Sequence, residues 1–202
     1  MKTTKTKIVG IVAIFGATMA VATTYSTPPA QIPQTGQTTS YATSDNGALQ
    51  TGTVGTNISV RFVTAKDPNG NACINGQEVE SDMQTGLMWV KAPSSTTYTW
   101  AKAVKTSATS GGALPISYCG YTDWRLPNLN ELRSLVNYGE SNVATWLNST
   151  GFSNVQADDY WSSTIYAFSI GNAWSVNMSY GRNSVGSKTS YLRMVWPVRG
   201  GQ

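Results

Sequence analysis

Few side chains in this sequence could do catalytic chemistry. The 202 residues include no His and only two Cys, so a Cys-His nucleophile pair cannot be built. Asp158 and Asp159 are adjacent acids that could bind a cation or act as a general acid, although such a pair also marks turns at strand boundaries. Calcium needs several oxygen ligands, and Asp123 and Glu131 are further candidates that nothing in the sequence brings together with the pair. We therefore predict no enzyme activity, no metal site and no cofactor.

Ligand binding is a second kind of chemistry, indicated by residues 165–172 and 180–190. Both stretches are rich in Tyr, Ser, Asn or Gly and contain no Asp or Glu. Tyr gives rigid contact area and Ser and Asn give adaptable hydrogen bonds, a composition typical of binding surfaces, although an ordinary pair of surface loops shares it. The candidate ligand-binding residues are Tyr166, Phe168, Asn172, Tyr180, Arg182, Asn183, Lys188 and Tyr191.

The charges near the C-terminus favour an acidic partner. No Asp or Glu follows Asp159, whereas Arg182, Lys188, Arg193 and Arg199 all do. Such an excess could attract an acidic glycan or another anionic surface. The alternative is four ordinary solvated side chains, some of them paired with acids from the N-terminal half.

Residues 120–132 are expected to organise the fold. Pro127 favours an extended residue before it, and Asn128 with Glu131 three positions later forms a capping-box pattern at a helix start. Four apolar residues then fall on one helical face, at Leu129, Leu132, Leu135 and Val136.

Periodicity predicts the remaining elements. Residues 58–64 and 173–179 alternate as half-buried strands do, residues 87–90 form a short apolar run typical of a buried strand, and residues 191–198 are a further strand candidate. Residues 98–104 predict a helix with Trp100, Ala101 and Val104 on one side. Helices and strands without βαβ alternation indicate an α+β domain. Large aromatic residues expected in its core are Trp89, Trp124, Trp161, Trp174 and Trp196.

Four segments in this order resemble the Lcl C-terminal domain family: residues 85–91, 120–132, 160–164 and 191–202. With a similar lead-in, the resemblance covers about residues 31–202. It implies a C-type-lectin-like fold in which two helices flank short antiparallel sheets. It also implies adhesion, including binding to sulfated polysaccharides, without a catalytic motif, and it allows a homo-oligomer such as a trimer.

The N-terminus predicts export. Three Lys precede the apolar residues 8–22, which end in a small-x-small cleavage pattern. We expect a signal peptide at residues 1–22, with an uncleaved membrane tether as the alternative, then a flexible Thr/Gln/Gly-rich arm at 23–57 and a domain at 58–202. No later stretch is long and apolar enough to span a membrane. The protein would be secreted, placed at the cell surface or held in the periplasm.

Export bears on the cysteines and on the net charge. In an oxidising compartment, Cys73 and Cys119 predict one disulfide. Removing residues 1–22 leaves 11 basic against 10 acidic residues, so the sequence does not support a nucleic-acid binder.

The expected function is an adhesin-like module that binds a glycan, sulfated or otherwise acidic, or a host or neighbouring surface protein. The alternative is a structural subunit of a bacterial envelope or surface appendage.

Overall fold

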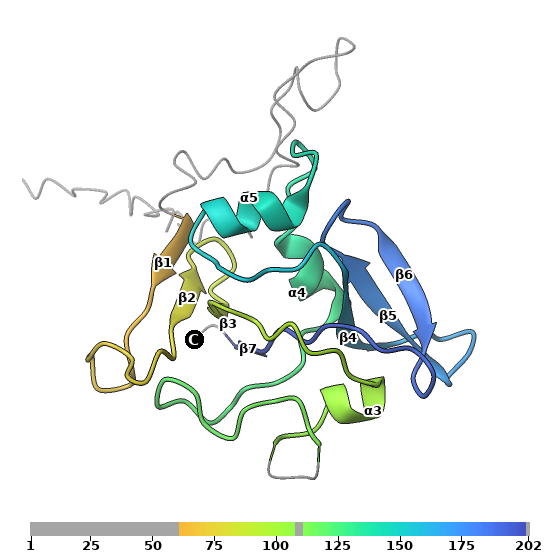
Figure 1. Cartoon of the computed structure of the whole chain (residues 1–202), viewed down its shortest axis with the longest axis horizontal. Helices are drawn as coiled ribbons and strands as arrows, with labels where there is room; N and C mark the ends of the chain where they lie inside the picture. Colours follow the sequence, from red (N-terminus) through yellow and green to blue (C-terminus); the bar gives the residue numbers. More distant parts are fainter. Residues whose placement is uncertain (1–60, 108–110, 201–202) are drawn as a thin grey trace, which may run out of the picture. The chain divides into compact units, whose positions relative to one another are not determined.

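The computed structural model describes residues 61–107 and 111–200 (Figure 1). All of them belong to one compact unit, Gln31–Gln202. The predicted signal peptide, the predicted arm and the first three residues of the predicted domain lie outside the described residues. Among those described, no helix is long and apolar enough to cross a membrane.

The first of two antiparallel sheets joins distant parts of the chain. Its strand order is β1-β2-β3-β7, so the C-terminal strand closes a sheet that begins near residue 61. The register pairs Trp89 of β3 with Val198 of β7, and both side chains are buried. Its strands are β1 Phe62–Thr64, β2 Val79–Asp82, β3 Met88–Val90 and β7 Val198–Arg199.

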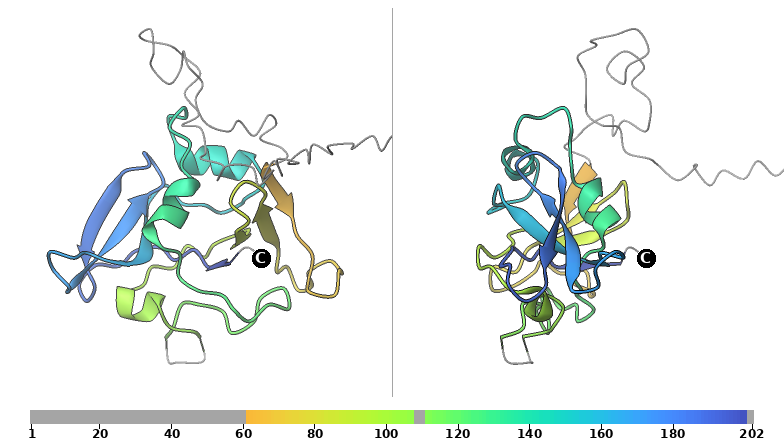
Figure 2. Two further views of the ribbon diagram at one scale, coloured as in Figure 1. Left: turned by 180° about the vertical axis from the view of Figure 1, so that it is seen from behind. Right: turned by 90° about the vertical axis from the view of Figure 1, so that its right-hand side faces the viewer.

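The second sheet is local in sequence and has the order β4-β5-β6. In the front and back views, the helices α4 and α5 lie between the two sheets (Figure 2). The register between β4 and β5 shifts between Trp161 and Ile165, a bulge-like irregularity that adds twist to the strand end. Its strands are β4 Asp159–Ile165, β5 Asn172–Asn177 and β6 Asn183–Ser187.

Three short helices complete the described domain: α3 Trp100–Ala103, α4 Leu129–Ser134 and α5 Val143–Ser149. The predicted capping box starts α4, because the Asn128 side chain accepts from Glu131 N at 2.9 Å and the Glu131 carboxylate accepts from Asn128 N at 2.8 Å. The α+β class is confirmed. Helix α5 is additional to the two helices that the resemblance implied, and its Asn142 cap accepts from Thr145 N.

Four of the five Trp residues expected in the core are buried, and Trp174 is the exception. The largest apolar cluster contains Trp89, Trp124 and Trp196, and a second cluster contains Trp161. Trp89 and Trp196 meet edge to face, with ring centroids 5.6 Å apart. The predicted disulfide is also confirmed, since Cys73 and Cys119 are bonded and their Cα atoms lie 4.9 Å apart.

Two predicted elements need correction. Residues 191–197 are not a strand: only isolated bridges, such as that between Tyr98 and Arg193, hold this segment before β7. Helix α3 is only four residues long and buries Ala103, not the predicted side, because Ala101 is exposed and Val104 is 36% exposed. A helix this short takes its orientation from its neighbours and not from its own periodicity.

Candidate functional site

An exposed aromatic group stands at the turn between β4 and β5. Phe168 is 91% exposed and its ring centroid lies 5.6 Å from that of Tyr166. Tyr166 in turn meets the half-buried Trp174 of β5 edge to face at 5.2 Å. The backbone of Tyr166 donates to Asn172 O at 3.1 Å and closes the turn. These rings contact one another in series from the sheet out to solvent. We call Tyr166, Phe168, Asn172, Trp174 and Lys188 the hairpin surface.

Lys188 connects this turn to α3. Its Nζ donates to Ile170 O at 2.7 Å and lies 4.4 Å from the centre of the Trp100 ring. Its backbone N–H donates to Gly171 O and its carbonyl accepts from Trp100 N. An ammonium group over an indole face is held by the ring's negative quadrupole. Lys188 therefore places a fixed positive charge beside the aromatic group, and within the described residues no carboxylate pairs with it.

The eight predicted ligand-binding residues do not form one cluster. The register places Asn172 against Ser187 at one end of β5 and Val176 against Asn183 at the other. Six residues of strand span roughly 17–20 Å, so Tyr180 and Arg182 lie far from the hairpin surface. One group contains Tyr166, Phe168, Asn172, Lys188 and Tyr191, and the other contains Tyr180, Arg182 and Asn183.

Two of the four C-terminal basic residues form ion pairs with carboxylates. Arg193 is 6% exposed and pairs with Asp159 at 2.9 Å, while Arg199 pairs with Asp123 at 2.7 Å. The alternative expected such pairs, but both acids come from the second half of the chain and Arg193 is buried instead of solvated. Among the described ion pairs, Arg182 and Lys188 have none, so these two are available to an acidic ligand.

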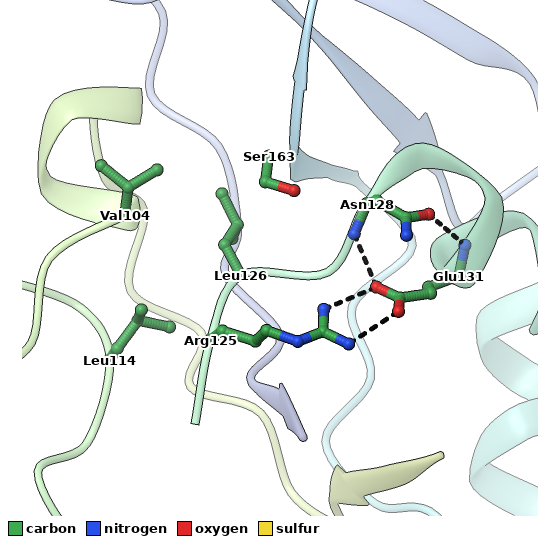
Figure 3. Close-up of a pocket in the computed structure, with 7 residues that line it drawn as sticks. All are labelled: Val104, Leu114, Arg125, Leu126, Asn128, Glu131 and Ser163. Carbon is green, nitrogen blue, oxygen red and sulfur yellow. Dashed lines mark hydrogen bonds and ion pairs between the residues drawn. The ribbon is translucent and has the colours of Figure 1, made fainter. Parts of the chain in front are cut away.

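A second candidate is a cavity of about 370 Å³ between α3, the start of α4 and strand β4 (Figure 3). Val104 and Leu114 lie on one side of it, Asn128 and Glu131 on the other, and Leu126 between them, while Arg125 reaches across to Glu131. Ser163, from β4, points into the space above Leu126. We call this cavity the α3–α4 pocket; its lining residues are Val104, Leu114, Arg125, Leu126, Asn128, Glu131 and Ser163.

The charged pair of the pocket is well ordered. Arg125 donates two bonds to the Glu131 carboxylate, at 2.8 and 2.7 Å. Burial alone would raise the pKa of Glu131, but the hydrogen bonds from Arg125 and from Asn128 N outweigh it, so the pKa lies below its usual value. The same pairing raises the pKa of Arg125. Both side chains are therefore charged at neutral pH, and their charges cancel.

The acids weighed as cation ligands are separated in the fold. Asp123 pairs with Arg199, Glu131 with Arg125, and Asp159 with Arg193, while Asp158 accepts from the next backbone N–H at 2.7 Å. Within the part of the chain that the structure describes, no three Cys, Asp or Glu residues are grouped as a metal site requires.

A family model describes most of this architecture. The model of the Lcl C-terminal domain matches residues 78–199. The chain belongs to the Lcl C-terminal domain family. The match includes the hairpin surface, the α3–α4 pocket and every described strand except β1. No curated protein matches the chain.

The sequence interpretation missed the partners that position these sites. Trp100 was assigned to a helix face, yet it lies under Lys188 and donates from its indole to Ser162 O at 2.8 Å. Trp174 was expected in the core, yet it supports Tyr166. The pocket residue Arg125 lies within residues 120–132. Its charge, opposite to that of Glu131 six positions later, was the signal that could have indicated the ion pair. Ser163 lies within residues 160–164, but nothing in that run of Ser and Thr distinguishes it from its neighbours.

Proposed function

We propose that this Lcl C-terminal domain is the binding head of an exported, adhesin-like protein, and that the hairpin surface recognises an acidic glycan. The observation that carries the proposal is Phe168, which is 91% exposed and lies against Tyr166 in a tilted ring contact. Large apolar side chains that remain in water as a group mark interaction sites more often than isolated ones do. Here the group is rigid, because β4 and β5 fix both ends of the turn.

The chemistry of the hairpin surface fits a sugar. A flat aromatic ring can stack on the C–H face of a pyranose, while the Asn172 side chain, which has no hydrogen-bond partner among the described residues, can bond its hydroxyls. The Lys188 ammonium adds attraction for a sulfate or carboxylate. Because exposed charges are screened over about 8 Å at physiological ionic strength, binding should weaken as salt rises.

Export supports the same proposal. A disulfide is compatible with an oxidising compartment, and the predicted signal peptide would deliver the chain there. We infer that the glycan is met outside the cytoplasm, at the bacterial surface or on a neighbouring cell. An alternative function is a structural subunit, which the apolar Ile170 favours because it is 79% exposed beside Phe168 and could pack against another protein.

A glycan array separates these functions. The chain without residues 1–22 is applied at low and at physiological salt, together with Phe168→Ala and Lys188→Gln. Each substitution should weaken binding of acidic glycans at least tenfold, and Lys188→Gln should also reduce the salt dependence. The matched controls are Tyr180→Ala and Arg182→Gln, which change an exposed aromatic and an unpaired cation at the far end of β5.

The controls should bind as the parent does. Equal losses at both ends of the sheet would show that the hairpin surface is not the site. If the parent binds no glycan at either salt concentration, the structural-subunit function is favoured.

A further inference from the structure

We propose that the α3–α4 pocket is a second binding site, and that it takes one uncharged sugar ring. This inference goes beyond the proposed function, because the pocket has a different lining and a different charge from the hairpin surface. Four features of the pocket carry it: an aliphatic wall, unused hydrogen-bond donors, cancelled charge and size.

The aliphatic wall suits the C–H face of a ring. Leu114 and Leu126 are 4% and 3% exposed and belong to the second core cluster, so their positions are fixed by packing. Val104 stands beside them and is 36% exposed. In Figure 3, Val104 and Leu114 lie on the side away from Glu131, and Leu126 stands between them and Glu131. A ligand ring placed against this wall would shield the exposed part of Val104 from water, which is favourable in proportion to the area covered.

The opposite side of the pocket holds more donors than the protein uses. A guanidinium has five N–H groups, and Arg125 directs two of them to Glu131. Asn128 accepts through its side-chain oxygen, while the two N–H groups of its amide have no partner among the described residues. The Ser163 hydroxyl likewise has none there. Glu131 accepts three bonds of about four that a carboxylate can take. Donors in excess of acceptors match a ligand rich in hydroxyl and ether oxygens.

The net charge selects a neutral ligand over an acidic one. Arg125 is a cation, but the Glu131 carboxylate lies 2.7 Å from it and cancels its charge. A sulfate or carboxylate entering the pocket would meet the Glu131 carboxylate together with the Arg125 cation, so it would gain no net attraction to offset its loss of water. A sugar hydroxyl can donate to Glu131 and accept from Arg125 or Asn128 without a change in charge. The pocket and the hairpin surface therefore recognise different parts of a ligand, or different ligands.

The size of the pocket limits the ligand to about one ring. Its volume of about 370 Å³ is near the lower end of the roughly 300–1,000 Å³ found for small-molecule sites. Because so small a site can contact only one ring, we expect millimolar affinity for a single sugar.

The test is a titration of the signal-free chain with methyl β-glucopyranoside, followed by the backbone amide signals in nuclear magnetic resonance. Saturable shifts are expected at Leu126, Asn128 and Ser163, at an affinity that salt does not change. Methyl β-glucuronide, which has the same ring with a carboxylate added, should bind at least tenfold more weakly. Equal or tighter binding of the glucuronide would overturn the neutral-ligand assignment.

Two variants locate the site. Ser163→Trp fills the pocket and should abolish the saturable shifts, whereas Ser117→Trp, at an exposed serine outside both sites, should not. Asn128→Asp preserves the side-chain oxygen that caps α4 but removes both amide donors, and it should weaken binding about tenfold with little change in folding. Phe168→Ala serves as the control for the hairpin surface and should leave these shifts unchanged. Undiminished binding by both pocket variants, or no saturable shift in the parent, would refute the proposal.

Discussion

The two sheets of this domain treat their polar and aromatic side chains in opposite ways. In the β1-β2-β3-β7 sheet, Arg61 pairs with the fully buried Asp82 at 2.8 Å, and Lys91 contacts two glutamates. In the β4-β5-β6 sheet, Phe168 and Tyr180 remain 91% and 70% exposed at opposite ends. The charged groups beside the first sheet are paired within the protein, whereas the turns of the second sheet leave large aromatic side chains in water. Under the proposed function, the first sheet would stabilise the domain and the turns of the second would carry recognition.

The sharpest test of this division uses two aromatic residues. Trp124 is 4% exposed, donates from its indole to Tyr118 O at 3.2 Å, and is followed by a residue that bridges to β7. Trp124→Ala should lower the free energy of unfolding by about 3–5 kcal/mol, through lost burial and the cavity left behind. Phe168→Ala should change it by less than about 0.5 kcal/mol. Urea denaturation of both variants measures the difference, and a Trp124→Ala protein of unchanged stability that no longer binds ligand would place Trp124 in the site instead.

The disulfide gives the next largest effect. Cys73 and Cys119 are 46 positions apart, and closing such a loop contributes about 4 kcal/mol in the chain-entropy model, although measured gains are often smaller. The Cys73→Ser/Cys119→Ser protein should therefore melt at a lower temperature. Because the bond lies away from β4-β5-β6, glycan binding below the new melting transition should persist. Loss of binding in the folded variant would show that the two regions are coupled.

Two arginines, one in an ion pair and one without, allow a matched comparison between the two sheets. Arg61 has a side chain 10% exposed and makes two bonds to Asp82. Arg61→Met leaves that carboxylate buried without its cation, which should cost about 3 kcal/mol. Arg182→Met removes a cation that forms no described ion pair, and it should leave the unfolding free energy within about 0.5 kcal/mol of the parent. Equal effects in chemical denaturation would contradict the division between the sheets.

The smallest effect is a difference in pH dependence. Burial raises the pKa of Glu80 above its ordinary value of 4.5, even though Thr64 and Lys91 bind the carboxylate. An acid whose pKa is raised by folding favours the folded state while protonated, and this contribution is lost as pH rises through the raised pKa. Glu80→Gln should therefore gain stability relative to the parent as pH rises.

Glu131→Gln should show the opposite sign. Since the pKa of Glu131 is lowered by folding, its contribution is present above the ordinary value and is lost as pH falls through the folded value. The variant should be less stable than the parent near neutral pH, and the difference in stability should disappear in acid. Denaturation from about pH 3 to pH 7 covers the carboxyl range and measures both trends, and parallel profiles for the two variants would rule out this assignment.

The features that could be predicted from the sequence depend on residues close together in the chain or on the even number of cysteines. The capping box of Asn128 and Glu131 depends on three-residue spacing, and the pairing of Cys73 with Cys119 on there being only two cysteines. Strand β6 was treated as part of a loop, because Asn, Ser and Gly are poor strand formers and only pairing with β5 makes the segment extended.

The candidate site shows where prediction from sequence stops. Arg182 and Lys188 are six positions apart and were expected to attract one acidic group. Strand β6 lies between them, so the chain is extended there and carries them to opposite ends of the sheet. The pairings of Arg193 with Asp159 and of Arg199 with Asp123 cross 34 and 76 positions. No local pattern encodes contacts of that range, and they decide which charges remain free.

The hydrogen bonds that close the β4–β5 turn make it a suitable place to insert a foreign peptide. Tyr166 N donates to Asn172 O, and Lys188 contacts the turn carbonyls of Ile170 and Gly171, so residues 167–169 lie outside every strand pairing. Exposed turns of this kind tolerate insertion because their backbone bonds few other segments. A foreign peptide epitope could therefore be inserted after Phe168 and displayed on a folded carrier, while the buried Trp residues and the disulfide keep the scaffold intact.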